Sequence, residues 1–192
     1  CFLFITAIVN SIFTFVLEGY GEEKLQWVNH THEVLLTTEK LLGSLKDAET
    51  GQRGYVITSD ASYLEPYNSG VISAKNIVEE LKVLTKDNPG QQRIMGLIEK
   101  EMLLKFEELK KTIQLVQGGY KASAFELNKG RQYMDNIRED LEKFAYAELV
   151  LLEERKGDFR ANKTQIYTLI FVEIIFFIIL SIFTLSFLGR SF

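Results

Sequence analysis

The sequence predicts an all-α protein: an antiparallel up-down-up-down four-helix bundle whose long first and fourth helices continue into two transmembrane helices. Three observations lead to this fold class. The 192 residues include only two prolines, which favours long helices over a loop-rich fold. Apolar residues recur at helical spacing through the middle of the chain. Both ends, at 1–17 and 166–188, are strongly apolar.

The two apolar ends predict membrane helices. About 20 apolar residues cross a bilayer as a helix, so 166–188 is long enough, and Tyr167 stands at its start as an interface marker. The run 1–17 predicts a second span that is truncated at its start. A cleaved signal peptide is the alternative for this run, because Gly19-Tyr20-Gly21 offers a small-x-small cleavage site. The predicted organisation is a transmembrane helix at 1–17, an external domain at 18–165, a second transmembrane helix at 166–188 and a cytoplasmic linker that begins at 189–192.

The first external helix is predicted from the membrane to about Thr58. Its apolar residues share one helical phase, and no proline interrupts it. These residues are Val28, Leu35, Leu42, Leu45 and Val56.

Helix-capping patterns predict the next two boundaries. Ser62-x-x-Glu65 is a capping box, so a second helix is expected from near Tyr63 to Asp87. In Asn88-Pro89-Gly90-Gln91, the asparagine is the expected cap, the proline takes the first helical position, and the glutamine reaches back.

The third helix is expected to end at Gly118-Gly119, since glycine is the usual residue after a helix. Ser123-x-x-Glu126 is a further capping box. The fourth helix begins there and runs toward the second membrane span with Gly157 as its sole interruption. Short connections make neighbouring helices antiparallel. Because the inner two helices are shorter, a stalk of two helices per chain remains near the membrane, and a parallel homodimer would complete it.

A polar segment near the end of the first helix breaks its apolar stripe. The phase set by the preceding leucines turns Glu49 and Gln52 inward, and Arg53 lies four residues from Glu49, which allows an ion pair. Gly51 and Gly54 let another chain segment approach closely.

Counting from the tip places this segment level with the start of the fourth helix. We therefore predict a buried polar network that joins Glu49, Gln52 and Arg53 to Arg131, Asp135 and Arg138. Because buried charge is costly unless paired, such a layer needs a reason. It either fixes helix register or captures a small-molecule or protein ligand.

Two further sets of polar residues are candidates for signalling. His32 falls in the seam near Glu148 of the fourth helix, where a histidine–carboxylate contact would respond to pH; a simple interhelix hydrogen bond is the alternative. Glu173 lies within the second predicted span with Ser181 and Thr184 on the same face. This face is expected to pack against partner helices, or Glu173 to extend toward the lipid surface.

The sequence excludes several function classes. A net charge of −4 and the absence of a basic stripe argue against nucleic acid as a partner. His30 and His32 are two residues apart, which is a poor spacing for a metal site on a helix. There is no nucleophile–base pattern and no phosphate-binding loop, so we expect no catalytic residues, metal or cofactor.

Several motifs in order resemble a known family. DAETGQRGYVITSDASYLEPY at 47–67, VNHTHEVL at 28–35, Asp87-Asn88-Pro89 and GRQYMDNIR at 130–138 are similar to the CHASE domain of the third type, an extracellular sensor domain of bacterial membrane receptors. Glu148 and Arg155 fit the later part of its pattern. The resemblance implies a helical bundle between two membrane helices that feeds a cytoplasmic output module, most often a histidine kinase. It supplies no ligand.

The function predicted from the sequence is therefore the non-catalytic signal-input region of a bacterial receptor. The receptor is expected to be a multi-pass protein of the inner or plasma membrane in a two-component system, with its sensor domain outside the cytoplasm and the lipid bilayer as a partner. Two alternatives remain: a membrane-anchored interaction module without signalling output, or the input region of a chemotaxis-type receptor or cyclase.

Overall fold

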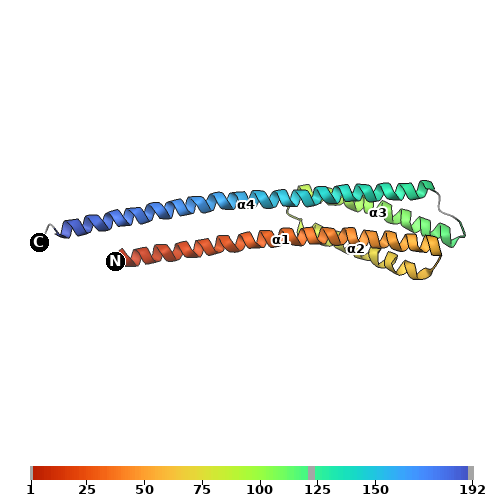
Figure 1. The fold of residues 1–192 in the computed structure, drawn as a ribbon, viewed down its shortest axis with the longest axis horizontal. Helices are drawn as coiled ribbons and strands as arrows, with labels where there is room; N and C mark the ends of the chain where they lie inside the picture. Colours follow the sequence, from red (N-terminus) through yellow and green to blue (C-terminus); the bar gives the residue numbers. More distant parts are fainter. Residues whose placement is uncertain (1, 121–123, 190–192) are drawn as a thin grey trace. The chain divides into compact units, whose positions relative to one another are not determined.

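The computed structural model describes residues 2–120 and 124–189, and it describes side-chain surroundings mainly over 26–120 and 129–157. The described backbone is helical and contains no strand, so the predicted all-α class is confirmed. The elements are α1 (Phe2–Thr58), the short 3-10 helix η1 (Ala61–Tyr63), α2 (Leu64–Leu84), α3 (Pro89–Gln117) and α4 (Ala124–Gly189). Figure 1 labels the four long helices.

The chain divides into two compact units. One unit is the continuous stretch Trp27–Leu151, and the other combines Cys1–Gln26 with Leu152–Phe192. The first of these, which we call the core unit, contains η1, α2 and α3 entire, together with parts of α1 and α4. All contacts discussed below lie within the core unit unless stated otherwise.

A single hydrophobic cluster fills the core unit. Each of the four long helices contributes buried side chains to it, for example Leu41 from α1, Val78 from α2, Ile98 from α3 and Phe144 from α4. Burial of such side chains supplies the main driving force for folding, at about 25 cal/mol per Å² of apolar surface. The four helices are therefore held by one shared core.

The buried positions of α1 recur every seven residues, which is the spacing of helices that pack knobs into holes. One series is Thr31, Thr38, Leu45 and Gln52, and the other is Val34, Leu41, Ala48 and Tyr55. The predicted stripe shared Leu45 with this seam but was otherwise wrong by about one residue, because Leu35 and Leu42 are only partly buried. The seam includes two threonines and a glutamine, and a stripe drawn through apolar residues alone misses them.

The connection from α1 to α2 is tighter than predicted. Ser59 adopts a left-handed backbone with φ 59°, and the Asp60 carboxylate accepts a hydrogen bond from the Ser62 backbone N–H at 2.9 Å. This bond lowers the pKa of the Asp60 carboxyl group below its ordinary value. Ser62 thus lies inside η1, and α2 begins at Leu64 without a side-chain cap, so the predicted capping box does not form.

The connection from α2 to α3 follows the prediction more closely. The Asn88 side chain accepts from the backbone N–H groups of Gly90 and Gln91 at 3.0 and 3.2 Å, with Pro89 at the start of the helix. The Gln91 side chain does not reach back to the cap; it points into the core unit, as described below. At the other end, α3 stops at Gln117 and Gly119 takes a φ of 81°, as the Gly118-Gly119 pair predicted. The Ser123 capping box lies outside the described residues.

Two glycines allow α1 and α2 to cross closely. A Cβ atom on Gly51 would lie 2.6 Å from the backbone nitrogen of Tyr67, and one on Gly70 would lie 2.6 Å from the backbone oxygen of Ser44. The prediction that Gly51 admits a neighbouring backbone is confirmed. Gly54 instead faces the Tyr63 ring.

The second unit is helical where it is described. Large apolar side chains of α4 from Phe171 to Phe183 are exposed there. Within the described part of the chain, however, no helix is both long and apolar enough to qualify as a membrane span, so the predicted spans at 1–17 and 166–188 are not confirmed. Ser181 is exposed. The side chains of Glu173 and Thr184 lie outside the described residues.

Candidate functional site

The polar segment of α1 turns one carboxylate toward α3. Glu49 is mostly buried, and its Oε1 atom accepts from Arg53 Nη2 at 3.2 Å, one helical turn away. Arg53 itself is 63% exposed. The predicted pairing of these two residues is confirmed, and it places a charged pair at the edge of the core.

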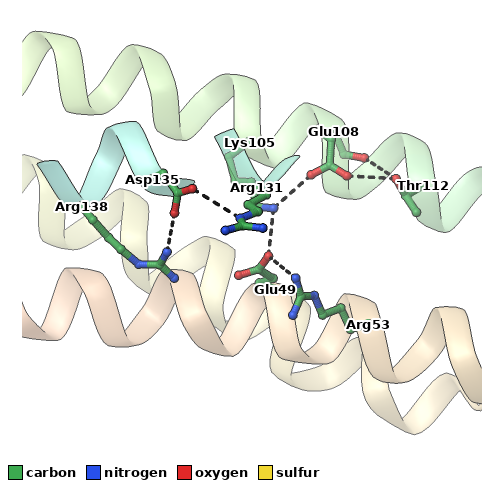
Figure 2. Close-up of polar contacts among 8 residues, drawn as sticks. All are labelled: Glu49, Arg53, Lys105, Glu108, Thr112, Arg131, Asp135 and Arg138. Carbon is green, nitrogen blue, oxygen red and sulfur yellow. Dashed lines mark hydrogen bonds and ion pairs between the residues drawn. The ribbon is translucent and has the colours of Figure 1, made fainter. Parts of the chain in front are cut away.

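A buried lysine of α3 is the centre of this region. Lys105 is 3% exposed, and its ammonium group lies 3.3 Å from Glu49 Oε1 and 3.1 Å from Glu108 Oε2. Thr112 donates its hydroxyl to Glu108 Oε1 at 3.2 Å and to the Glu108 backbone oxygen at 3.0 Å. Figure 2 shows these contacts as one chain. We call Glu49, Arg53, Lys105, Glu108 and Thr112 the Lys105 cluster. A buried ammonium group is tolerated only when it is paired, and here two carboxylates pair with it.

The start of α4 closes against this cluster. Gly130 is buried, and a Cβ atom at this position would collide with the Glu108 carboxylate. The missing side chain therefore lets the α4 backbone cover Glu108. The Lys105 cluster thus joins α1 to α3 by an ion pair and meets α4 through a glycine.

The predicted charges of α4 form a separate group. Arg138 Nη1 lies 2.8 Å from Asp135 Oδ1, and Arg131 Nε lies 3.6 Å from Asp135 Oδ2. All three side chains are at least 43% exposed, so these pairs contribute little to stability. Among the described contacts, none joins them to the polar residues of α1 (Figure 2). The network predicted between α1 and α4 is replaced by the α1–α3 pair; a role of these residues in sensing stays a prediction.

Gln52 is buried as predicted but is not part of the ion chain. Its side chain is 2% exposed, and Nε2 has no hydrogen-bond partner in the described structure. An unsatisfied buried donor costs about 1–3 kcal/mol. This amide is therefore a locally unfavourable feature of the α1 seam.

A second buried polar cluster lies about one helical turn from the start of the core unit on α1. Glu148 of α4 is 2% exposed, and its two oxygens accept from the Thr31 hydroxyl at 2.8 Å and the Gln91 amide at 2.7 Å. We call these three residues the Glu148 cluster. It links α1, α3 and α4 through hydrogen bonds to a carboxylate, which are stronger than bonds between neutral groups.

The prediction for His32 was wrong in phase. Glu148 is buried between helices as expected, but its α1 partner is Thr31, and His32 is exposed. His30 instead packs edge-on against Trp27, with ring centroids 6.0 Å apart. The contact between histidine and carboxylate that would have responded to pH is therefore not formed.

Sequence reasoning missed Lys105 and Gln91. Lysine and glutamine are usually exposed, so their residue types alone predict neither in the core. A signal was nevertheless present, because Gln91, Ile98, Lys105 and Thr112 are spaced by seven residues and all four are buried. Their shared heptad position places the polar residues on the same seam as the isoleucine.

The described surface carries two recesses, both beside α3. Over the described residues, no group of three or more His, Cys, Asp and Glu side chains is placed to hold a metal ion. A recess of about 140 Å³ lies between α3 and α4, and Asn136 donates across it to Glu101 at 3.4 Å. A second recess of about 380 Å³ lies along α3 at Gly96, Leu103 and Glu107. Pockets for drug-sized ligands are typically about 300–1,000 Å³, so the first recess is small and the second falls at the lower end of this range.

Comparison with known proteins shows the family of this chain. Residues 24–158 match the CHASE3 domain, which covers the whole core unit. The fold is similar to that of the sensor domain of the histidine kinase HK9 from Rhodopseudomonas palustris, seen in a crystal structure, with a TM-score of 0.58 and 19% sequence identity over 64% of this chain and 98% of that one. No curated protein matches the sequence. Because the match spans most of the chain and includes the motifs identified above, the chain belongs to the CHASE3 domain family.

Proposed function

We propose that this chain is the signal-input region of a bacterial membrane receptor, most often coupled in such proteins to a histidine kinase. The observation that carries the proposal is the CHASE3 match over 24–158. The fold shared with a histidine kinase sensor domain supports it. In this proposal the core unit is an antiparallel up-down-up-down four-helix bundle, which the shared core and the short connections favour.

The proposal places the core unit outside the cytoplasm and the two apolar ends in the bilayer. The support is the composition of 166–188 and the exposed apolar side chains of α4, such as Phe171, Ile179 and Phe183. Large exposed apolar surfaces are unusual in soluble proteins and are covered by lipid or another protein.

The mechanism we propose uses α1 and α4. Both contribute to the shared core, and Thr31 and Glu148 bond them directly. An external event that binds one packing of these helices more tightly than another shifts the population toward that packing. Since α4 is a single helix from Ala124 to Gly189, a shift or rotation of α4 would be passed along its length. Catalysis belongs to an output module, not to this chain.

A second copy of the chain is the proposed partner in the membrane. Tyr146, Leu149 and Val150 of α4 and Leu36 of α1 are exposed in the single chain. Contact between two chains through these residues of α1 and α4 would cover the exposed side chains and give a parallel homodimer.

A chimeric receptor tests the proposed function. Residues 1–192 replace the input region of a histidine kinase whose output drives a reporter gene. Glu148→Ala and Lys105→Met change buried polar contacts, whereas Glu142→Ala and Lys110→Met change exposed positions. We expect at least one buried variant to change the reporter signal by about fivefold or more, the usual lower range of allosteric coupling, and the exposed variants to leave it unchanged. If the chimera is present in the membrane and none of the four substitutions changes the reporter signal, a signalling role is contradicted.

Membrane placement is tested separately. A single cysteine at Ser59, in a Cys1→Ser background, should react with a membrane-impermeant maleimide in intact cells. Reaction only after lysis would place the tip in the cytoplasm.

A further inference from the structure

The Lys105 cluster contains an unusual arrangement of alternative partners. Glu49 and Lys105 form the described ion pair between α1 and α3, at 3.3 Å. Each of the two also has a partner on its own helix: Arg53 for Glu49 at 3.2 Å, and Glu108 for Lys105 at 3.1 Å. The four charges therefore alternate in sign along one chain (Figure 2).

We propose that the Glu49–Lys105 pair is an exchangeable latch between α1 and α3. When the latch opens, Glu49 keeps Arg53 and Lys105 keeps Glu108, so neither charge is left alone. Opening is then much less costly than breaking an ordinary buried ion pair, which leaves an uncompensated charge and lowers the folding equilibrium constant by about a hundredfold or more.

The two halves of the latch differ in how firmly they are held. On α3, Lys105 is almost fully buried, Glu108 also accepts from Thr112, and the α4 backbone at Gly130 covers the Glu108 carboxylate. On α1, Arg53 is 63% exposed. The α3 half is fixed by its neighbours, whereas Glu49 of the α1 half is held by an arginine that is largely in water. The element that moves on opening is therefore α1.

Such a latch is a two-state element within the fold. A buried polar residue at a heptad position normally fixes one register, whereas this arrangement lets α1 change its position relative to α3 without stranding a charge. The latch depends only on the free energy of one contact, so its existence is independent of the proposed receptor function.

A double-mutant cycle in two backgrounds tests the latch. Glu49→Gln, Lys105→Met and the double variant are made in the full chain and again in a chain carrying Arg53→Gln and Glu108→Gln. Urea unfolding of each variant, followed by circular dichroism, gives its folding equilibrium constant. From the four constants of one cycle we obtain the coupling factor, which is the factor by which one substitution changes the effect of the other on folding. We expect a factor below about threefold in the natural background and about tenfold or more where the local partners are removed, because a single substitution then leaves a lone buried charge.

The pair Lys82–Glu99 provides the matched control. This ion pair joins α2 to α3 at 2.9 Å, and Lys82 has a second partner, Glu79, on its own helix, but the pair is partly exposed. Its coupling factor should therefore stay below about threefold in both backgrounds. The proposal would be overturned if the coupling factor between Glu49 and Lys105 were equal in the two backgrounds. A coupling factor that is larger in the natural background would overturn it as well. If a variant unfolds in more than one step, hydrogen exchange of the amides at 44–56 measures the same factor from local opening.

Discussion

Gly70→Ala should destabilise the core unit, although alanine is the better helix former. The added Cβ atom would lie 2.6 Å from the Ser44 backbone oxygen and 2.7 Å from the Ala48 backbone nitrogen. These atoms belong to the α1 backbone and cannot rotate away, so α1 and α2 must separate and loosen the core between them. Such overpacking costs about 1–3 kcal/mol, and helix propensity returns about 1 kcal/mol. With contacts this short we expect the upper part of that range, and a net loss of about 1–2 kcal/mol.

Gly96→Ala is the matched control. Gly96 is an exposed residue inside α3, and a Cβ atom there would meet nothing within 4 Å. Only the propensity gain remains, so this variant should be more stable by about 0.5–1 kcal/mol. The assay is urea unfolding of the full chain by circular dichroism, with the two variants compared side by side. If Gly70→Ala proved as stable as Gly96→Ala, the close crossing of α1 and α2 would be refuted.

Two further predictions concern single carboxylates. Glu148→Ala leaves two buried donors without an acceptor and should cost about 1–3 kcal/mol, whereas exposed Glu142→Ala should stay within about 0.5 kcal/mol of the natural chain; similar losses in urea unfolding would argue against the buried cluster. The pKa of Asp60 is lowered by its bond from Ser62, so its contribution to stability is present above the ordinary carboxyl pKa and is lost as the pH falls through the lowered pKa. The stability difference between the natural chain and Asp60→Ala should therefore shrink in strong acid, and a difference that stays constant with pH would contradict this cap.

Helix boundaries that depend on local chemistry were largely predictable from the sequence. Asn88 caps α3 with its side chain, and Gly119 follows its end with a positive φ. These residues act on backbone groups within a few positions, so their effect does not depend on the rest of the fold. Ser62 was the exception, because the Asp60 side chain caps this turn instead and Ser62 lies within η1.

Interhelix partners were less predictable because they depend on helix phase. An error of about one residue rotates a helix by roughly 100°, which is enough to replace Thr31 by His32 as the expected partner of Glu148. Polar seam residues caused this error: Thr31, Thr38 and Gln52 are buried in α1, while the apolar residues beside some of them are not. Lys105 was missed for a different reason: lysine is usually exposed, and its burial depends partly on Glu49 of α1, which the sequence does not show to be adjacent.

In the proposed mechanism, a change in the packing of α1 against α4 accompanies signalling. Spin labels at the exposed residues Glu33 and Glu142, one on each helix, report this packing as a distance distribution by pulsed electron paramagnetic resonance. The measurement is made on the purified chimeric receptor in a Cys1→Ser background, with variants of high and low reporter output. We expect the distance distributions of the two classes of variant to differ. The same distance distribution in variants whose outputs differ would contradict a packing change between α1 and α4 as the signal.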